Sequence, residues 1–299
     1  MESMSTEPTP GPGPGPEPTD AGPVDRALAE SPDQDYVGTR DLTRWPTAAG
    51  RFILDLSLRA ARRIAPHRLL AITLAIGLGL VTILTALAAG VYDSVVEADG
   101  IAGLDRPVLD AVLDARTTTG NRVVTAFTNL GGPVEMPVLA TVAALALALA
   151  WRQWTPIALT AVTGLGSLLL TMVGKAAVGR SRPPLVDAVP PFETSFSFPS
   201  GHALNSLALA GIIAYLLVRK QRHAWARALT IALASAFAVL MGLSRVYLGH
   251  HWLTDVLVAW TLALAWLTVV ITAHRLFITL RRRRRPAGHN QFTWPVSRL

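Results

Sequence analysis

Long apolar segments alternate with shorter polar ones along most of the chain. A helix rises about 1.5 Å per residue, so roughly 20 apolar residues cross the ~30 Å hydrocarbon core of a membrane. The pattern therefore predicts an all-α integral membrane bundle of six transmembrane helices. The six predicted spans are Leu69–Val91, Val134–Ala150, Thr155–Val173, Ala203–Val218, Ala228–Leu243 and Leu253–Ala273.

The predicted six-span domain covers residues 69–280, and the segments around it differ in composition. Residues 1–48 are acidic and rich in proline and glycine, without apolar periodicity, so we expect disorder. Residues 49–68 mix apolar and basic positions, which predicts a juxtamembrane amphipathic helix. Residues 281–299 form a basic tail that begins with consecutive arginines, and these favour holding the end of the last span in the cytoplasm.

Composition supports the membrane class and excludes several chemistries. Of 299 residues, 51% are hydrophobic and the mean hydropathy is +0.39, which is too apolar for a soluble domain with a charged surface. The absence of cysteine excludes disulfides, thiolate nucleophiles and cysteine metal sites. The net charge of +7 comes from residues beside the spans and in the tail, so we expect anionic lipid and no nucleic acid as partner.

Charge also predicts how the spans are oriented. Basic residues cluster before the first predicted span, between the second and third, between the fourth and fifth, and after the sixth. Loops rich in lysine and arginine face the cytoplasm, so both termini are predicted there, and the other loops face outward. The loop after the third span breaks the trend, because it carries Lys175, Arg180 and Arg182. Either function requires cations there, or the statistical rule tolerates a few exceptions.

The run Pro199-Ser200-Gly201-His202 stands at the start of the fourth predicted span. Ser200 is a favoured N-cap, and the first backbone N–H groups of the helix then favour an anion. Gly201 allows the anion close to the backbone, and His202 would stand beside it. The alternative is an ordinary helix start with one interfacial histidine.

A second candidate pair lies at the start of the sixth predicted span. A helix that begins near His251 places Asp255 one turn later on the same face. The carboxylate can then accept the Nδ1 proton of the imidazole and leave Nε2 available, as in catalytic triads. His250 has Thr254 at the same offset, so the spacing favours His251. The alternative is an interfacial aspartate with a bystander histidine.

Three cations belong to the same outward loops. Lys175, Arg182 and Arg245 together suit a phosphomonoester, which carries about −1.5 to −2 charges near neutral pH. Arginine matches phosphate oxygens with two parallel hydrogen bonds. For Arg180 we favour contact with lipid headgroups instead.

In their order and spacing, these motifs resemble the signatures of the type 2 phosphatidic acid phosphatase superfamily, which also includes the vanadium haloperoxidases. The matching motifs are Lys175-x6-Arg182-Pro183, Pro199-Ser200-Gly201-His202 and Ser244-Arg245-x5-His251-x3-Asp255. Every signature position is filled, and the resemblance extends from about Leu69 to Ala273. Six spans with outward motifs are similar to the lipid phosphatase branch.

The resemblance implies a role for each motif residue. His251 would be the nucleophile that forms a phosphohistidine, Asp255 would orient it, and His202 would protonate the leaving oxygen. The phosphate would be held by Lys175, Arg182, Ser200, Gly201 and Arg245. The implied mechanism needs no metal and no cofactor, and its site would lie on the extracytoplasmic face.

We therefore expect a metal-independent membrane phosphatase acting on lipid phosphate or diphosphate monoesters. Candidate substrates are polyprenyl diphosphate, phosphatidylglycerophosphate and phosphatidic acid. One alternative is a phosphotransferase that uses the same phosphohistidine. Another is a non-catalytic transporter or binding protein for anionic lipids, although binding alone does not require the pair His251 and Asp255 with a second histidine. The first outer loop carries Leu104, Val108 and Val112 at helical spacing, which indicates either an interfacial helix or packing over the helix ends.

Overall fold

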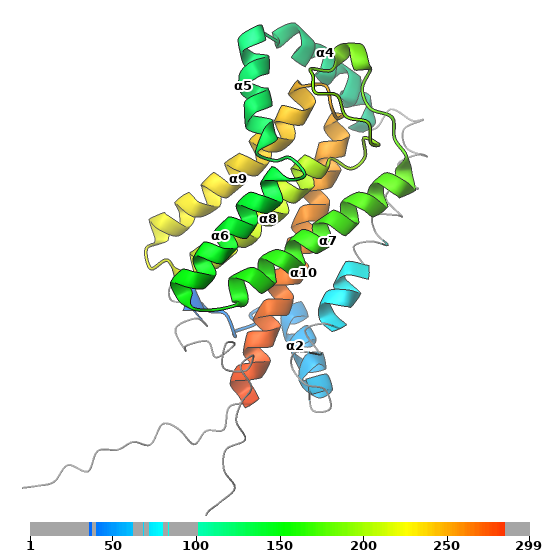
Figure 1. The fold of residues 1–299 in the computed structure, drawn as a ribbon. Helices are drawn as coiled ribbons and strands as arrows, with labels where there is room; N and C mark the ends of the chain where they lie inside the picture. Colours follow the sequence, from blue (N-terminus) through cyan, green and yellow to red (C-terminus); the bar gives the residue numbers. More distant parts are fainter. Residues whose placement is uncertain are drawn as a thin grey trace, which may run out of the picture.

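The computed structural model describes residues 36–37, 40–61, 68, 72–79, 83 and 101–284. Within them the regular secondary structure is helical apart from one small antiparallel pair of strands, β1 Tyr36–Val37 and β2 Arg40–Asp41 (Figure 1). The first predicted span, Leu69–Val91, lies mostly outside the described residues. The part of it that is described, residues 72–79 and 83, is helical. The described helices are α2 Ala48–Ala61, η2 Ile101–Leu104, α4 Asp105–Ala115, α5 Thr118–Asn129, α6 Glu135–Trp151, α7 Thr155–Val178, η3 Leu185–Asp187, α8 Gly201–Lys220, α9 Ala224–Tyr247 and α10 Leu253–Arg284.

Four of these helices, α7 to α10, are long and apolar enough to cross a membrane, and α6 is a shorter apolar helix. They indicate a multi-pass membrane protein. Each of the five helices coincides with a span predicted from the sequence. Helix α6 matches its span within a residue, α8 and α9 extend beyond theirs at both ends, and α7 and α10 extend at their C-terminal ends. Helix α7 continues through Lys175 until Gly179, whose φ of 61° ends it in the left-handed region that glycine adopts without strain. Helix α10 continues into the arginines, which are good helix formers.

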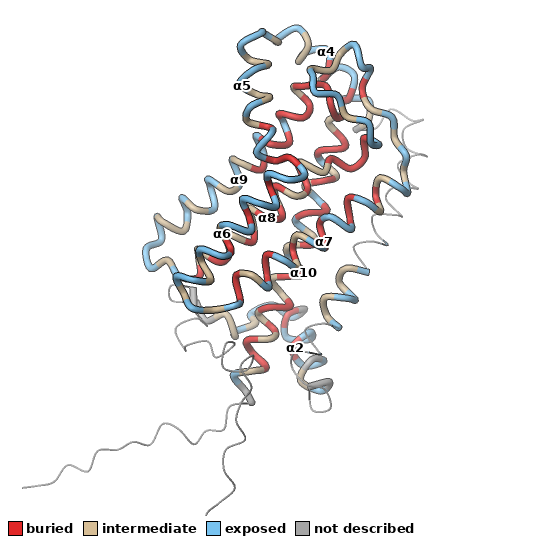
Figure 2. The backbone as a smooth tube through the Cα atoms, viewed as in Figure 1, coloured by how far each residue is buried: buried red, intermediate tan, exposed pale blue. Residues whose placement is uncertain are grey.

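Helix α8 lies at the centre of the bundle and packs against α6, α7, α9 and α10 (Figures 1 and 2). Leu204, Ile212 and Leu216 of α8 are fully buried in the main core. Helices α7 and α10 meet where Trp266 Nε1 donates to the Thr163 carbonyl over 3.1 Å. This approach requires a glycine, because a Cβ at Gly166 would lie 2.2 Å from the Trp266 ring.

Helices α4 and α5 cover one end of this bundle (Figure 1). In α4, Leu109 is buried and Val108 packs against the main core, whereas Leu104 just before the helix is exposed. These contacts favour packing over the helix ends for Val108. In α5, Thr128 is buried and hydrogen bonds with Ser244 of α9, so α5 is attached to the end of α9.

The opposite end of the bundle holds both described chain ends. Arg275 of α10 donates to the carbonyls of Leu42 and Arg44, and the Trp45 indole donates to Thr279 Oγ1 over 3.3 Å. Helix α2 packs against the same part of α10 through Leu54. The end of the predicted disordered segment, 1–48, thus makes contacts in the described structure. Residues 1–35 and 285–299 lie outside the described residues.

Candidate active site

The three motif segments meet at the bundle end that α4 and α5 cover. Lys175 lies in the last turn of α7, and Arg245 in the last turn of α9. Ser200 is the N-cap of α8, so Gly201 and His202 occupy its first turn. Asp255 lies in the first turn of α10, and Arg182 and His251 lie in the loops before α8 and α10. All eight predicted site residues therefore come to one end of the bundle.

Ser200 connects the beginnings of α8 and α10. Its side chain accepts a hydrogen bond from Ala203 N over 3.5 Å, as an N-cap does, and its own N–H donates to the Asp255 carbonyl over 3.3 Å. A Cβ at Gly201 would lie 3.3 Å from Thr171 Cγ2, so this turn packs closely on α7. His202 follows on α8 and interacts electrostatically with Arg245, Glu193 and His251.

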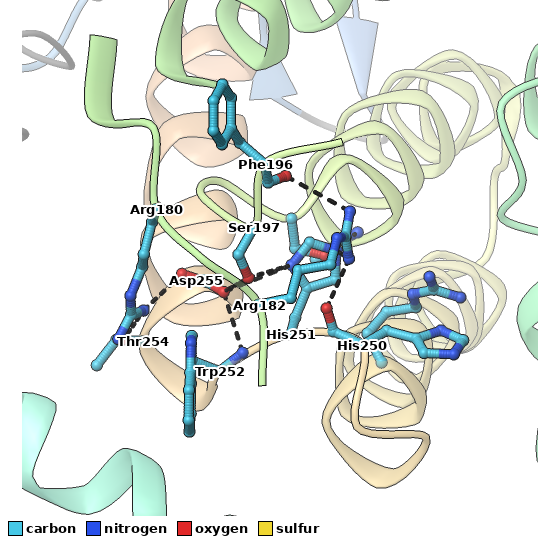
Figure 3. Close-up of polar contacts among 12 residues, drawn as sticks. Arg180, Arg182, Phe196, Ser197, His250, His251, Trp252, Thr254 and Asp255 are labelled. Atoms are coloured by element: carbon cyan, nitrogen blue, oxygen red, sulfur yellow. Dashed lines mark hydrogen bonds and ion pairs between the residues drawn. The ribbon is translucent and has the colours of Figure 1, made fainter. Parts of the chain in front are cut away.

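The His251 ring is buried between two groups that differ in charge (Figure 3). Its Nδ1 lies 3.5 Å from Asp255 Oδ2 and 3.4 Å from Ser197 Oγ, which itself donates to Asp255 Oδ2. Its Nε2 lies 3.2 Å from Nη1 of Arg182. A guanidinium only donates, so Nε2 must be the acceptor and the neutral ring carries its proton on Nδ1. The lone pair of the neutral ring therefore lies on Nε2.

Burial is the main cause that lowers the pKa of His251 to about 4; the hydrogen bond and the charge of Asp255 act in the opposite direction, and the nearby cations Arg182 and Arg245 add to the lowering. The imidazole is consequently neutral near pH 7. Only the neutral ring has a lone pair, so this environment suits a nucleophile.

The neighbouring His250 is held differently. Its Nε2 lies 2.7 Å from the Val189 carbonyl, to which it donates, and its own carbonyl accepts from Arg182 over 2.6 Å. Burial and Arg245 lower the pKa of His250 to about 4. Through these hydrogen bonds His250 connects the loop before α10 to the segment before α8. Its Nε2 is occupied by the Val189 carbonyl, whereas Nε2 of His251 faces Arg182.

Glu193 lies between the two arginines expected to hold phosphate. One carboxylate oxygen pairs with Arg245, and the other lies 3.3 Å from Arg182 Nη2. Burial alone would raise the pKa of Glu193, but Arg245 and Arg182 together lower it to about 2. The carboxylate therefore occupies an anion position formed by two guanidinium groups.

Lys175 and Arg182 hold the loop that precedes α8. Both donate to Ser195 Oγ, over 3.2 Å and 3.1 Å, and to the Phe196 carbonyl. Arg245 is more deeply buried and donates to Thr128 Oγ1 over 3.3 Å. Its buried Nε has no hydrogen-bond acceptor among the residues that the structure describes. This donor can serve an oxygen of a bound anion.

The interpretation of Arg180 as a headgroup contact is wrong. Its Nη1 lies 2.6 Å from Asp255 Oδ1, and its Nη2 lies 2.7 Å from Asp105 Oδ2. Only 16% of the side chain is exposed. Two buried carboxylates attract the guanidinium inward, because an unpaired buried charge is costly.

Sequence reasoning missed three residues of the site: Asp105, Glu193 and Ser197. Ser197 and Glu193 lie in the irregular loop before Pro199, where no periodicity predicts direction. Asp105 lies on α4, separated by 149 residues from its partner Thr254. Nothing local indicated that contact.

Comparison with known proteins identifies a family and two relatives. The family model described as the PAP2 superfamily matches residues 154–278. Phosphatidylglycerophosphatase B of Bacillus subtilis is 32% identical over 173 residues, which cover 56% of this chain and 82% of the relative. Undecaprenyl-diphosphatase of Sulfolobus acidocaldarius is 37% identical over 78 residues, which cover 26% of this chain and 33% of that relative.

A solved structure is similar in fold. It is a crystal structure described as that of the first transmembrane PAP2 type phosphatidylglycerolphosphate phosphatase from Bacillus subtilis. The match has a TM-score of 0.53 with 27% sequence identity, and it covers 72% of this chain and 98% of the other. The similarity thus extends through nearly the whole length of that membrane phosphatase.

Proposed function

Because this chain belongs to the PAP2 superfamily, we propose that it is a membrane phosphatase that hydrolyses lipid phosphate or diphosphate monoesters through a phosphohistidine at His251. The observation that carries the proposal is the state of the His251 ring. Its Nδ1 faces Ser197 and Asp255, and its Nε2 faces the guanidinium of Arg182. A neutral, oriented imidazole beside fixed cations is what attack on a phosphate requires.

In the proposed reaction, Nε2 of His251 attacks phosphorus, and the bond between phosphorus and the lipid oxygen breaks. His202 gives its proton to that leaving oxygen. Water then attacks the phosphohistidine, His202 takes up the proton of that water, and inorganic phosphate leaves with His251 restored. Asp255 stabilises the ring through Ser197 while it carries charge.

The phosphate oxygens would be held by Lys175, Arg182, Arg245, Ser200 and Gly201. The supporting observations are the pairing of one carboxylate with both Arg182 and Arg245, and the start of α8, where backbone N–H groups favour an anion. Metal independence is part of the proposal. Among the described residues, no group of three or more His, Asp and Glu is placed to hold a metal ion.

A lipid anchor is supported by an apolar groove between α6, α7 and α8. Pro137 and Ala144 of α6 and Leu165 of α7 line it, and Asn205, one turn after His202, lies in its wall. A hydrocarbon chain in such a groove would keep its phosphate near the first turn of α8. The names of the relatives suggest phosphatidylglycerophosphate and polyprenyl diphosphate as substrates, and phosphatidic acid is the third candidate.

We further propose an extracytoplasmic site with both termini in the cytoplasm. The site and the described chain ends lie at opposite ends of α10, which supports opposite sides of the membrane. The arginines of α10 after Leu280 favour the cytoplasm for the chain ends.

The test is phosphate release by the purified protein in detergent with EDTA, across a panel of phosphatidylglycerophosphate, polyprenyl diphosphate and phosphatidic acid. Wild type is compared with His251→Ala and with His223→Ala, a control at an exposed histidine at the start of α9. We expect release by wild type and the control, and loss in His251→Ala. Lipid binding without release in all three proteins would indicate a binding protein and overturn the proposal. Transfer of phosphate to an added acceptor in place of release would indicate a phosphotransferase.

A further inference from the structure

The carboxylate of Asp105 is buried at the start of α4, outside every motif of the site. Only 5% of the residue is exposed. Its Oδ1 accepts from the backbone N–H of Thr254 over 2.9 Å, and its Oδ2 accepts from the Thr254 hydroxyl over 2.7 Å and from Arg180 Nη2 over 2.7 Å. Helix α4 is thereby attached to the first turn of α10, which carries Asp255.

Arg180 connects this carboxylate to the one beside His251. Its Nη1 donates to Asp255 Oδ1 over 2.6 Å, while its Nη2 holds Asp105. The guanidinium also lies against the Trp252 ring, 5.5 Å from its centroid. A planar group with two acidic partners and an aromatic neighbour has little freedom to turn.

As a consequence, the two carboxylate oxygens of Asp255 have different partners (Figure 3). Oδ1 faces Arg180, and Oδ2 accepts from Ser197 and from the Trp252 N–H over 3.0 Å. It is Oδ2 that lies 3.5 Å from His251 Nδ1. The orientation of the His251 ring therefore depends on Asp255 not rotating.

Without Asp105, Arg180 would lose the carboxylate that holds its Nη2. An arginine with a single carboxylate partner prefers to bind both of its oxygens with two parallel hydrogen bonds. Such a pair would draw Oδ2 of Asp255 away from Ser197 and His251. Asp105 prevents this by holding the second nitrogen.

We infer that Asp105 and Arg180 are positioning residues for the reaction, acting on His251 through Asp255. The inference rests on the proposed function of His251 as nucleophile. Arg180 pairs with the carboxylates of Asp105 and Asp255, whereas the anion position is formed by Arg182 and Arg245, so we expect the effect on turnover rather than on phosphate binding.

The experiment compares Asp105→Asn with Asp110→Asn on the same helix. Asp110 is an exposed control, paired with the exposed Arg106. Each protein is assayed for kcat on the best lipid phosphate and for the inhibition constant of inorganic phosphate. In Asp105→Asn we expect kcat to fall about 10- to 100-fold, as for other residues that orient a ligand or catalytic group. The inhibition constant should stay unchanged, as should both values in Asp110→Asn.

A second arm separates positioning from a general structural role. In an Asp255→Asn background, adding Asp105→Asn should cause no further fall in kcat, because the route to His251 is already interrupted. If Asp105→Asn does not fold, Arg180→Lys replaces it, since one ammonium cannot hold both carboxylates in this geometry. Its kcat should fall by about tenfold or more with phosphate inhibition unchanged.

The outcomes distinguish failure of the positioning role from failure of the proposed phosphatase activity. A wild-type kcat in Asp105→Asn or in its substitute Arg180→Lys overturns the positioning role and leaves the proposed phosphatase intact. A full further loss in the Asp255→Asn background also overturns it. Absence of phosphate release by wild type overturns the proposed function, and the positioning role with it.

Discussion

Nη1 of Arg182 lies 3.2 Å from Nε2 of His251, so a guanidinium covers the lone pair that the proposed reaction uses. The same guanidinium holds Glu193, Ser195 and the His250 carbonyl. A substrate phosphate between Arg182 and His251 would take over these hydrogen bonds. In the proposed reaction, Arg182 would orient the ring through Nε2 before the substrate arrives and would stabilise charge on the phosphate afterwards.

Replacement of Arg182 by alanine should therefore reduce kcat about 10²- to 10³-fold, the usual cost of one fixed donor to transition-state charge. Steady-state phosphate release measures the effect. Arg222→Ala, in the loop at the other end of the bundle, is the control and should retain wild-type kcat. An Arg182→Ala enzyme with unchanged kcat would remove Arg182 from the site.

The pH dependence of kcat/KM should show an acidic limb near pH 4. The pKa of His251 is lowered to about 4, so the ring is neutral above that pH and protonated below it. Protonation removes the Nε2 lone pair, and activity falls as the pH decreases through about 4. The measurement is phosphate release between pH 3 and about 8 on folded protein, checked by circular dichroism. A limb near the ordinary histidine value of about 6.5 would contradict this environment of His251.

Substitution of His250 should affect mainly stability, whereas substitution of His251 should affect mainly turnover. His250→Leu leaves the partly buried Val189 carbonyl without its donor and should lower the free energy of unfolding by about 0.5–1.5 kcal/mol. It should still release phosphate and keep the acidic limb, whereas His251→Leu should lose turnover. Thermal unfolding and phosphate release on the two variants check this. Loss of turnover in both, with equal stability, would refute the assignment.

Glu193 should compete with phosphate for Arg182 and Arg245. Since its pKa is lowered to about 2, the carboxylate is charged throughout the working pH range. Glu193→Gln should therefore tighten inhibition by inorganic phosphate about tenfold, equal to about 1.4 kcal/mol. Glu135→Gln, exposed at the start of α6, is the matched control. Weaker inhibition in Glu193→Gln would show that the carboxylate assists phosphate binding.

The contact between α7 and α10 gives a test of packing. Gly166→Ala should destabilise the bundle by about 1–3 kcal/mol, because the new Cβ would lie 2.2 Å from the Trp266 ring. Gly164→Ala on the same helix is the control, since its Cβ would meet Leu209 at an ordinary 3.4 Å. Thermal unfolding in detergent should show a lower midpoint only for Gly166→Ala. Equal midpoints would mean that Trp266 moves aside at little cost.

The sequence predicted the long helices because apolar runs report burial in hydrocarbon directly. It did not predict α5 Thr118–Asn129 as a helix, because its threonines, Asn121 and Gly120 are poor helix formers and its position depends on contacts with α9. Helix α4 was foreseen as an amphipathic segment, but its attachment through Asp105 was not. Local periodicity carries no information about a partner 149 residues away.

In the candidate site, too, local patterns predicted some residues, whereas contacts between distant segments were not predicted. The motif residues were predicted because helix caps and a spacing of four residues have fixed geometry, and the structure places them at one end of the bundle. Glu193 and Ser197 lie in a loop whose course is set by Lys175 and Arg182, so no pattern within the loop indicated them. Arg180 was misinterpreted because its two carboxylate partners come from different helices.

The contact of Arg275 with the Leu42 carbonyl spans 233 residues. A ribosome makes Leu42 well before Arg275, so this contact forms only after helices α4 to α9 and most of the bundle have been synthesised. Trp45, which packs against Arg275 and donates to Thr279, belongs to the same late contact. The segment before α2 therefore attaches to the bundle late in synthesis, and a chain shortened before Arg275 would lack that attachment.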